Sequence, residues 1–162
     1  NQSYKVFSNI PFNITNQIVK KLLYSPNPPH DTHLFTQKEA ALRLCGLPTE
    51  QEFSILTKPW FSYEIIYNFK RTDFVPMPNV NVVLLHIYMR QPALLNLADA
   101  EAYRKFVRFG YRQQKKDLMA GLKNIFTYEQ WRHIARDLTF PPHAATTDLS
   151  AQQWVGLFKV FQ

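Results

Sequence analysis

Glycine is scarce in this chain of 162 residues. The four glycines are isolated from one another, at Gly46, Gly110, Gly121 and Gly156. Phosphate-binding loops and dinucleotide-binding turns need several glycines within a few residues. The sequence therefore contains no complete nucleotide-binding motif, and we expect any nucleotide-like cofactor to be held partly by residues outside this chain.

Cysteine and long apolar runs are rarer still. Cys45 is the only cysteine, so an internal disulfide or a multi-thiol zinc site is excluded and a reducing cytoplasm is the expected location. The five histidines show no metal-ligand spacing, and we expect no metal. Apolar runs stay below the roughly 18 residues of a membrane span, so no membrane partner is expected. The chain opens without an initiator Met or a signal-like segment, as the middle of a protein would.

Acidic residues are outnumbered by basic ones. Nineteen Lys and Arg against twelve Asp and Glu give a formal net charge of +7, which suits a polyanionic partner such as nucleic acid or an anionic membrane surface. Hydrophobic residues make up 46% of the chain and aromatic residues 15%. This content supports a packed core and excludes global disorder.

The order of predicted elements changes along the chain. Apolar runs predict strands at residues 4–8, 32–36, 63–69 and 80–89, the first of them buried, and helical patterns fall between them at residues 13–24, 38–44 and 54–60. Beyond residue 91 only helices are predicted, at 97–116 and 117–126 and after capping boxes that begin at Thr127 and Ser150. Strands alternating with helices, followed by helices alone, predict an α/β part and then an all-α part.

One short segment fits the chemistry of methyl transfer to an exocyclic amine. The N6 amine of adenine is a poor nucleophile, and the Asn9 side-chain oxygen and the Ile10 carbonyl can accept its two hydrogens and aim the nitrogen for in-line attack. Phe12 can stack on an extruded base, and Pro11 restricts the backbone between them. As an isolated string, Asn-Ile-Pro-Phe is more typical of a strand-ending turn. The rest of the sequence decides between the two interpretations.

Three ordered segments resemble Erm-type rRNA adenine N6-methyltransferases and their relatives, the small-subunit rRNA adenine dimethylases. Residues 5–15 resemble the catalytic-loop motif, residues 36–40 a second conserved segment, and residues 73–84 the late motif of an aromatic residue, spaced prolines and a buried strand. Residues 153–158 are similar to the C-terminus of Erm proteins. The resemblance spans essentially the whole chain in the correct order.

The resemblance implies a fold and a cofactor. Residues 1–90 would be the C-terminal part of a Rossmann-like S-adenosylmethionine-dependent methyltransferase sheet, and residues 91–162 a small all-α RNA-binding domain. The Gly-rich cofactor loop of the family, with its acidic ribose and adenine contacts, would lie upstream. We therefore expect this chain alone to bind S-adenosylmethionine weakly.

The resemblance also implies roles for site residues. Asn9 would contact both the cofactor and the target amine, while Phe12 and Phe74 would sandwich the flipped adenine. Phe12 stands where much of the family has Tyr, and a phenyl ring keeps the stacking face while losing one hydroxyl. Without the resemblance, an aromatic residue before a proline-rich turn, as at Phe74, is typical of core packing.

Cations in two regions are candidate RNA contacts. Arg43, Lys70 and Arg71 fit phosphate contacts and solvated surface equally well. In the helix predicted at 97–116, a helical spacing of i, i+4, i+8 and i+11 would place four cations in one row, namely Arg104, Arg108, Arg112 and Lys115. Such a row can follow a phosphate backbone, although a charged helix is often only solvated.

The function that the resemblance implies is mono- or dimethylation at N6 of an adenine in 23S rRNA, in the unassembled or partly assembled large subunit. This modification confers macrolide, lincosamide and streptogramin B resistance, and a cytoplasmic monomer is expected. Two alternatives stay open: a small-subunit rRNA adenine dimethylase, and a non-catalytic RNA-binding module. Asn-Ile-Pro-Phe and the short helical ending favour the Erm type over the first, whereas the missing Gly-rich loop keeps the second open.

Overall fold

The computed structural model describes residues 3–113, 115 and 117–162. The chain forms two compact units, one of residues 1–48 and 61–92 and the other of residues 49–60 and 93–162. The predicted domains, 1–90 and 91–162, differ from these units chiefly in the segment Thr49–Trp60, which lies in the second unit.

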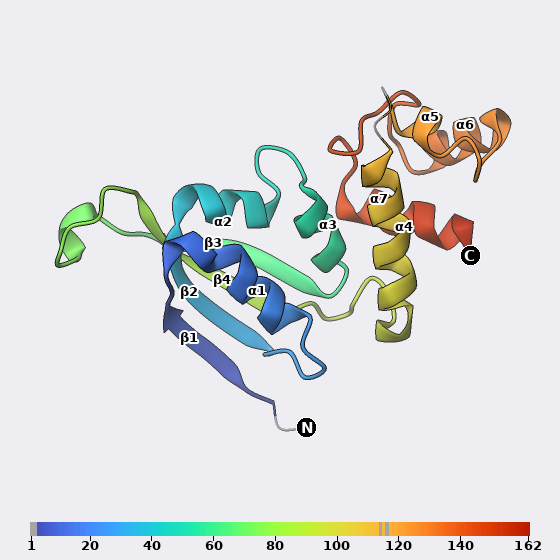
Figure 1. Ribbon diagram of the computed structural model, residues 1–162. Coiled ribbons are helices and arrows are strands. Elements are labelled where there is room, and N and C mark those ends of the chain that lie inside the picture. The colour runs from blue at the N-terminus through green and yellow to red at the C-terminus, as the bar shows by residue number, and fades with distance from the viewer. Residues whose placement is uncertain (1–2, 114, 116) are drawn as a thin grey trace. The chain divides into compact units, whose positions relative to one another are not determined.

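A mixed four-stranded sheet forms the centre of the first unit (Figure 1). The strands lie in the order β1-β2-β4-β3, with bounds Lys5–Asn9, Asp31–Gln37, Val82–Met89 and Phe61–Asn68 respectively. β1 is parallel to β2, whereas β4 is antiparallel to both of its neighbours. A parallel pair needs a crossover connection, which the helix α1 (Thr15–Leu23) provides. The expected α/β class is confirmed.

One face of this sheet carries the core of the first unit. Alternation along β2 buries Thr32, Leu34 and Thr36, and the helices α1 and α2 (Lys38–Cys45) cover this face (Figure 1). α2 ends at Gly46, whose φ of 74° lies in the left-handed region that favours glycine. The helices thereby fix the ends of β1 and β2, where the candidate site begins.

The expectation that the first strand is buried is wrong for the described residues. Every second side chain of β1 is exposed, and Phe7 is 70% exposed. In the described sheet β1 pairs with β2 alone, so its other edge receives no strand. Apolar composition predicted the strand correctly but not the exposure of its side chains in the described sheet.

The second unit is helical, as predicted for the region after residue 91. Its helices are α3 (Glu52–Thr57), α4 (Ala100–Arg112), α5 (Leu118–Gly121), α6 (Tyr128–Asp137) and α7 (Ala151–Phe161). Both predicted capping boxes are confirmed, because the hydroxyls of Thr127 and Ser150 accept from the backbone N–H groups of Gln130 and Gln153.

Aromatic side chains dominate the core of the second unit. Tyr103, Trp131, Trp154 and Phe158 are at most 1% exposed. α4 and α7 pack closely because Gly110 of α4 lies against Trp154, and a Cβ atom at position 110 would come within 2.7 Å of that indole ring. The buried aromatic residues of α7 therefore serve the packing of this helical core.

The central helix is shorter than the predicted range 97–116. A 3-10 turn occupies Leu97–Asp99, and α4 ends at Arg112 because Gln113 adopts an extended backbone with ψ of 98°. Of the helix predicted at 117–126, only Leu118–Gly121 is α-helical. Among the described residues, no helix combines the length and the apolar character needed to cross a lipid bilayer.

Candidate active site

The segment that follows β1 turns sharply into α1. Pro11 has φ −59° and ψ 125°, and a 3-10 turn, η1 (Phe12–Ile14), follows it, closed by a hydrogen bond from the Ile14 N–H to the Pro11 carbonyl at 3.2 Å. Asn9 and Pro11 are exposed, Phe12 is half-buried, and Ile10 is 6% exposed. Ile10 thus anchors the loop in the core while its neighbours stay accessible, as an amine-binding loop requires.

A buried pair of hydroxyls fastens this loop to the sheet. The Thr15 hydroxyl lies 3.1 Å from the Phe12 carbonyl and 3.1 Å from the Thr36 hydroxyl of β2. By residue type, Asn13 and Thr15 are the candidate side-chain caps of the helix predicted at 13–24, but neither caps α1: the cap position is Ile14, without a side-chain hydrogen bond. Thr15 is instead the first residue of α1 and fixes the position of Phe12.

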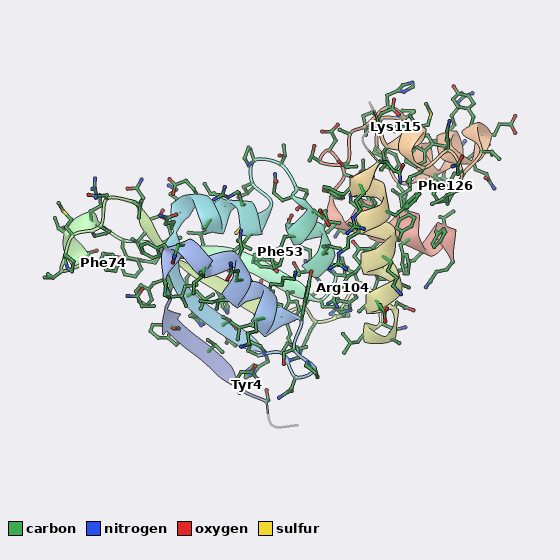
Figure 2. All side chains as sticks on the ribbon, viewed as in Figure 1. Tyr4, Phe53, Phe74, Arg104, Lys115 and Phe126 are labelled. Atoms are coloured by element: carbon green, nitrogen blue, oxygen red, sulfur yellow. The ribbon has the colours of Figure 1, made fainter. Side chains whose placement is uncertain are left out.

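The connection between β3 and β4 carries Phe74. It contains a 3-10 turn, η2 (Arg71–Asp73), in which the Asp73 carboxylate accepts from the Lys70 backbone N–H at 2.9 Å. Across the same connection, the Arg71 Nε donates to the Pro78 carbonyl at 2.8 Å. Figure 2 labels Phe74 on this connection, which extends beyond the end of the sheet.

The two segments, more than 60 residues apart in sequence, line one cavity of about 410 Å³ within the first unit. Its lining comprises Asn9, Ile10, Pro11, Phe12, Phe74, Val75, Pro76, Pro78 and Val82. Among these described lining residues, Asn9 has the only polar side chain. The volume of the cavity lies within the usual range of small-molecule sites. A largely apolar lining with one amide side chain is also typical of such sites.

An aromatic cluster that the sequence did not predict supports Phe74. The Phe74 ring centroid lies 5.4 Å from that of Phe69 and 6.5 Å from that of Phe35, and Phe35 and Phe69 stack at 5.1 Å. Phe7 meets Phe35 edge-on at 5.5 Å. Phe74 is therefore both a lining residue and a packed one, so the two interpretations of its role are compatible. The cluster joins β1, β2 and the β3–β4 connection, so only the tertiary structure could have revealed it.

The predicted RNA contacts of the first unit are all exposed. Lys70 and Arg71 lie four and three residues before Phe74, respectively, on the connection that lines the cavity. Arg71 also braces that connection through its bond to Pro78. Arg43 lies in the last turn of α2. Their exposure agrees with a phosphate-contacting role and with a solvated one.

The predicted row of four cations in the second unit is incomplete. Arg104, Arg108 and Arg112 belong to α4, but Lys115 lies beyond the end of that helix and cannot continue the row. Lys116, also in the predicted range, lies outside the described residues. The guanidinium of Arg104 is half-buried over the Trp60 ring, 5.3 Å from its centroid (Figure 2). Arg108 and Arg112 remain as neighbours on one side of the helix.

A methyl-transfer site has to hold both the methyl acceptor and the methyl donor. A planar base needs aromatic or apolar faces and an oriented hydrogen-bond acceptor, and the cavity supplies both through Phe12, Phe74 and Asn9. A nucleotide-like donor usually also needs a glycine-rich turn, which these 162 residues lack. The described residues therefore fit the acceptor side of a methyl-transfer site.

Known proteins with the same sequence pattern are rRNA methyltransferases. The family model described as ribosomal RNA adenine dimethylase matches residues 1–162. The chain is 32% identical to the ribosomal RNA small subunit methyltransferase A of Nostoc punctiforme, over 94% of the chain and 56% of that protein. It is 25% identical to an rRNA adenine N-6-methyltransferase of Bacillus licheniformis, over 97% of the chain and 55% of that protein.

Solved structures share the fold. The crystal structure of the 23S rRNA methyltransferase ErmE matches with a TM-score of 0.86 and 23% identity, over 98% of this chain and 65% of that one. A dimethyladenosine transferase from Plasmodium falciparum matches with a TM-score of 0.74 and 19% identity, over 99% of this chain and 68% of that one. Both likenesses support the expected Rossmann-like methyltransferase fold.

The chain spans just over half the length of the curated relatives it matches, 56% and 55% of the two named above. Within that span the family match leaves no residue of the chain out. The expected relationship is therefore confirmed, and this chain belongs to the ribosomal RNA adenine dimethylase family.

Proposed function

We propose that this chain is the C-terminal part of an S-adenosylmethionine-dependent enzyme that methylates N6 of an adenine in 23S rRNA, with macrolide, lincosamide and streptogramin B resistance as the result. The cavity that joins residues 9–12 to Phe74 carries the proposal. Residues 1–90 supply the acceptor side of the catalytic site, and residues 91–162 contribute to RNA binding. The protein acts as a cytoplasmic monomer.

The proposed chemistry follows from the loop after β1. The Asn9 side-chain oxygen and the Ile10 carbonyl accept the two amine hydrogens, which localises the nitrogen lone pair and directs it outward. S-adenosylmethionine, when bound, supplies an electrophilic methyl group on a sulfonium. Asn9 also borders the donor, while Phe12 and Phe74 hold the adenine ring between them. The Thr15 hydroxyl donates a hydrogen bond to the Phe12 carbonyl and so fixes the position of Phe12 in the cavity wall.

The RNA partner is proposed from charge. Lys70 and Arg71 lie on the connection that carries Phe74, which supports a role for them as contacts to phosphates beside an extruded nucleotide. Arg43, Arg108 and Arg112 are further candidate phosphate contacts, whereas Arg104 is engaged with Trp60. Phosphate contacts of this kind position the RNA, and the base itself is selected in the cavity.

A second candidate function is adenine dimethylation in small-subunit rRNA. The identity of 32% to a small subunit methyltransferase A, against 25% to an rRNA adenine N-6-methyltransferase, favours this candidate. The sequence Asn-Ile-Pro-Phe and the short helical ending favour 23S rRNA. Both candidates use the same cavity and the same acceptor chemistry, so they differ in the RNA that is bound.

The test is methyl transfer by the full-length protein to separate 23S and 16S transcripts, with a labelled methyl group on the donor. The proposal expects label in the 23S transcript, recovered after nuclease digestion as N6-methyladenosine or N6,N6-dimethyladenosine. Label confined to the 16S transcript would establish the second candidate. Tight RNA binding without label in either transcript would identify a non-catalytic RNA-binding module.

A further inference from the structure

Three potential metal ligands converge on the face of the sheet opposite α1 and α2. Asp31 Oδ1 lies 3.2 Å from His33 Nδ1 and 3.0 Å from His86 Nε2. One ligand atom from each residue lies within 4.8 Å of the other two. Histidine spacing in the sequence predicted no metal site, because the third residue comes from a strand more than 50 positions away.

Strand register brings the three side chains together. Asp31 and His33 are two residues apart in β2 and so leave the same face of the sheet. His33 is the direct cross-strand partner of His86 in β4, and their rings stack with centroids 4.3 Å apart and 14° between planes. Cross-strand partners of this kind have Cβ atoms about 5 Å apart. The arrangement is therefore set by the backbone of two paired strands, which is a rigid support.

Hydrogen bonds and neighbouring charges act on the Asp31 carboxylate, and the two imidazoles can bind an ion only when they are neutral. Burial by itself would raise the pKa of Asp31, but hydrogen bonding and charge from His86, then His33 and Lys5, lower the pKa below its ordinary value. Lys5 contacts the other carboxylate oxygen at 3.4 Å, and its side chain is 68% exposed. Oδ1 thus faces the two imidazoles while Lys5 can move into solvent.

We propose that Asp31, His33 and His86 form a three-ligand site for a divalent transition-metal ion, with Zn²⁺ as the expected occupant. Two imidazole nitrogens and a carboxylate oxygen are zinc ligands, and bonds of about 2.0–2.1 Å in a tetrahedron separate neighbouring ligand atoms by about 3.3 Å. The O–N distances of 3.0 and 3.2 Å are already close to that separation, and the two stacked imidazoles would have to rotate so that a nitrogen of each points at the ion. Water completes the coordination.

The proposed site has a structural consequence that is independent of methyl transfer. The ion would link β2 to β4, and both strands lead to the cavity, since Thr36 of β2 anchors Thr15 and Val82 of β4 lines the cavity wall. An ion that binds only the folded chain stabilises it in proportion to the logarithm of the ion concentration over its Kd. Zinc is therefore expected to stabilise the sheet beneath the candidate active site.

The experiment uses the untagged full-length protein, stripped with a chelator and titrated with ZnCl₂ by calorimetry. One ion per chain is expected, with a raised Tm, and Mg²⁺ is expected to leave the Tm unchanged because it prefers oxygen ligands. His33→Gln and His86→Gln should each weaken zinc binding at least about tenfold. The matched control is His143→Gln, which removes a histidine that also contacts an aspartate, Asp117 at 3.0 Å, but that belongs to no group of three potential ligands among the described residues.

A spectroscopic measurement on the parent protein does not depend on whether the variants fold. Co²⁺ added to the parent chain should give the visible d–d absorption of a four-coordinate site and should be displaced by Zn²⁺. The Cys45→Ala background excludes the one thiol of the chain as a ligand. The proposal is overturned if the parent binds no Co²⁺ or Zn²⁺, or if His143→Gln weakens binding as much as His33→Gln does.

Discussion

The hydroxyls of Thr15 and Thr36 lie 3.1 Å apart in the core, where these residues are 2% and 0% exposed. Thr15 reaches from the start of α1, and Thr36 from the end of β2. Since Thr15 also bonds the Phe12 carbonyl, this pair connects the sheet to the loop that lines the cavity.

The first prediction concerns that pair. Thr15→Val leaves the Thr36 hydroxyl buried without its partner and releases Phe12, so it should destabilise the chain by about 1–3 kcal/mol. Thr36→Val should cost less, because Thr15 keeps the Phe12 carbonyl. A double-mutant cycle by urea denaturation measures the coupling. Thr57→Val is the control for the loss of a hydroxyl, because it removes a buried hydroxyl bonded within its own helix. If the effects of Thr15→Val and Thr36→Val on the free energy of unfolding are additive, the two hydroxyls are not coupled.

A second prediction tests the acceptor role of Asn9. In the full-length protein, Asn9→Ala should slow methyl transfer at least tenfold, because an oriented hydrogen bond worth about 1.5–3 kcal/mol is lost. Asn9 is exposed, so stability and RNA affinity should barely change. Single-turnover kinetics with labelled donor measure the rate. A near-normal rate would remove Asn9 from the catalytic role.

A third prediction separates stacking from packing at the two rings. Phe12→Ala should lose about 1–3 kcal/mol of base stacking, measured as affinity for an RNA containing the target adenine, whereas Phe12→Tyr should be close to neutral. Phe74→Ala should lose stacking and also stability, because Phe74 packs on Phe69. Phe109→Ala, at a 40% exposed position on α4, is the control. Unchanged RNA affinity for Phe12→Ala would identify that ring as packing alone.

A fourth prediction concerns the cations of α4. Changing Arg108 and Arg112 together to Gln should weaken binding to a 23S rRNA hairpin and lower the salt slope by about 0.7–0.9 for each lost phosphate contact. The preferred adenine should stay the same. The control changes Lys20 and Lys21 of α1 to Gln, which removes the same two positive charges from a different helix. Equal affinities and parallel slopes for the two double variants would show that this side of α4 is solvated surface.

A fifth prediction follows from the lowered pKa of Asp31. A carboxyl group whose pKa is lower in the folded chain than in the unfolded chain contributes stability above its ordinary pKa of 3.8, and this contribution is lost as pH falls through the folded value. With chelator present, the free energy of unfolding of the Asp31→Asn variant should therefore fall less between pH 6 and pH 3 than that of the parent. If the parent and the variant lose equal stability over that range, the histidines and Lys5 do not hold the carboxyl group in its charged form.

The sequence by itself determined the local structure of this protein. Apolar runs and capping boxes predicted the strands and the helices that begin after Thr127 and Ser150, because these signals depend on residues a few positions apart. The same locality explains the candidate loop at residues 9–12, which follows β1 as predicted. The resemblance of ordered segments then supplied the family.

Only the tertiary structure decided which distant residues meet. The register of β2 against β4 brings His33 to His86. The β3–β4 connection brings Phe69 to Phe35 and Phe74 to the loop after β1. The end of α4 at Arg112 removed Lys115 from the predicted row. Pairing across a sheet and the termination of a helix depend on packing between segments far apart in the chain, and no local pattern of residue types records that packing.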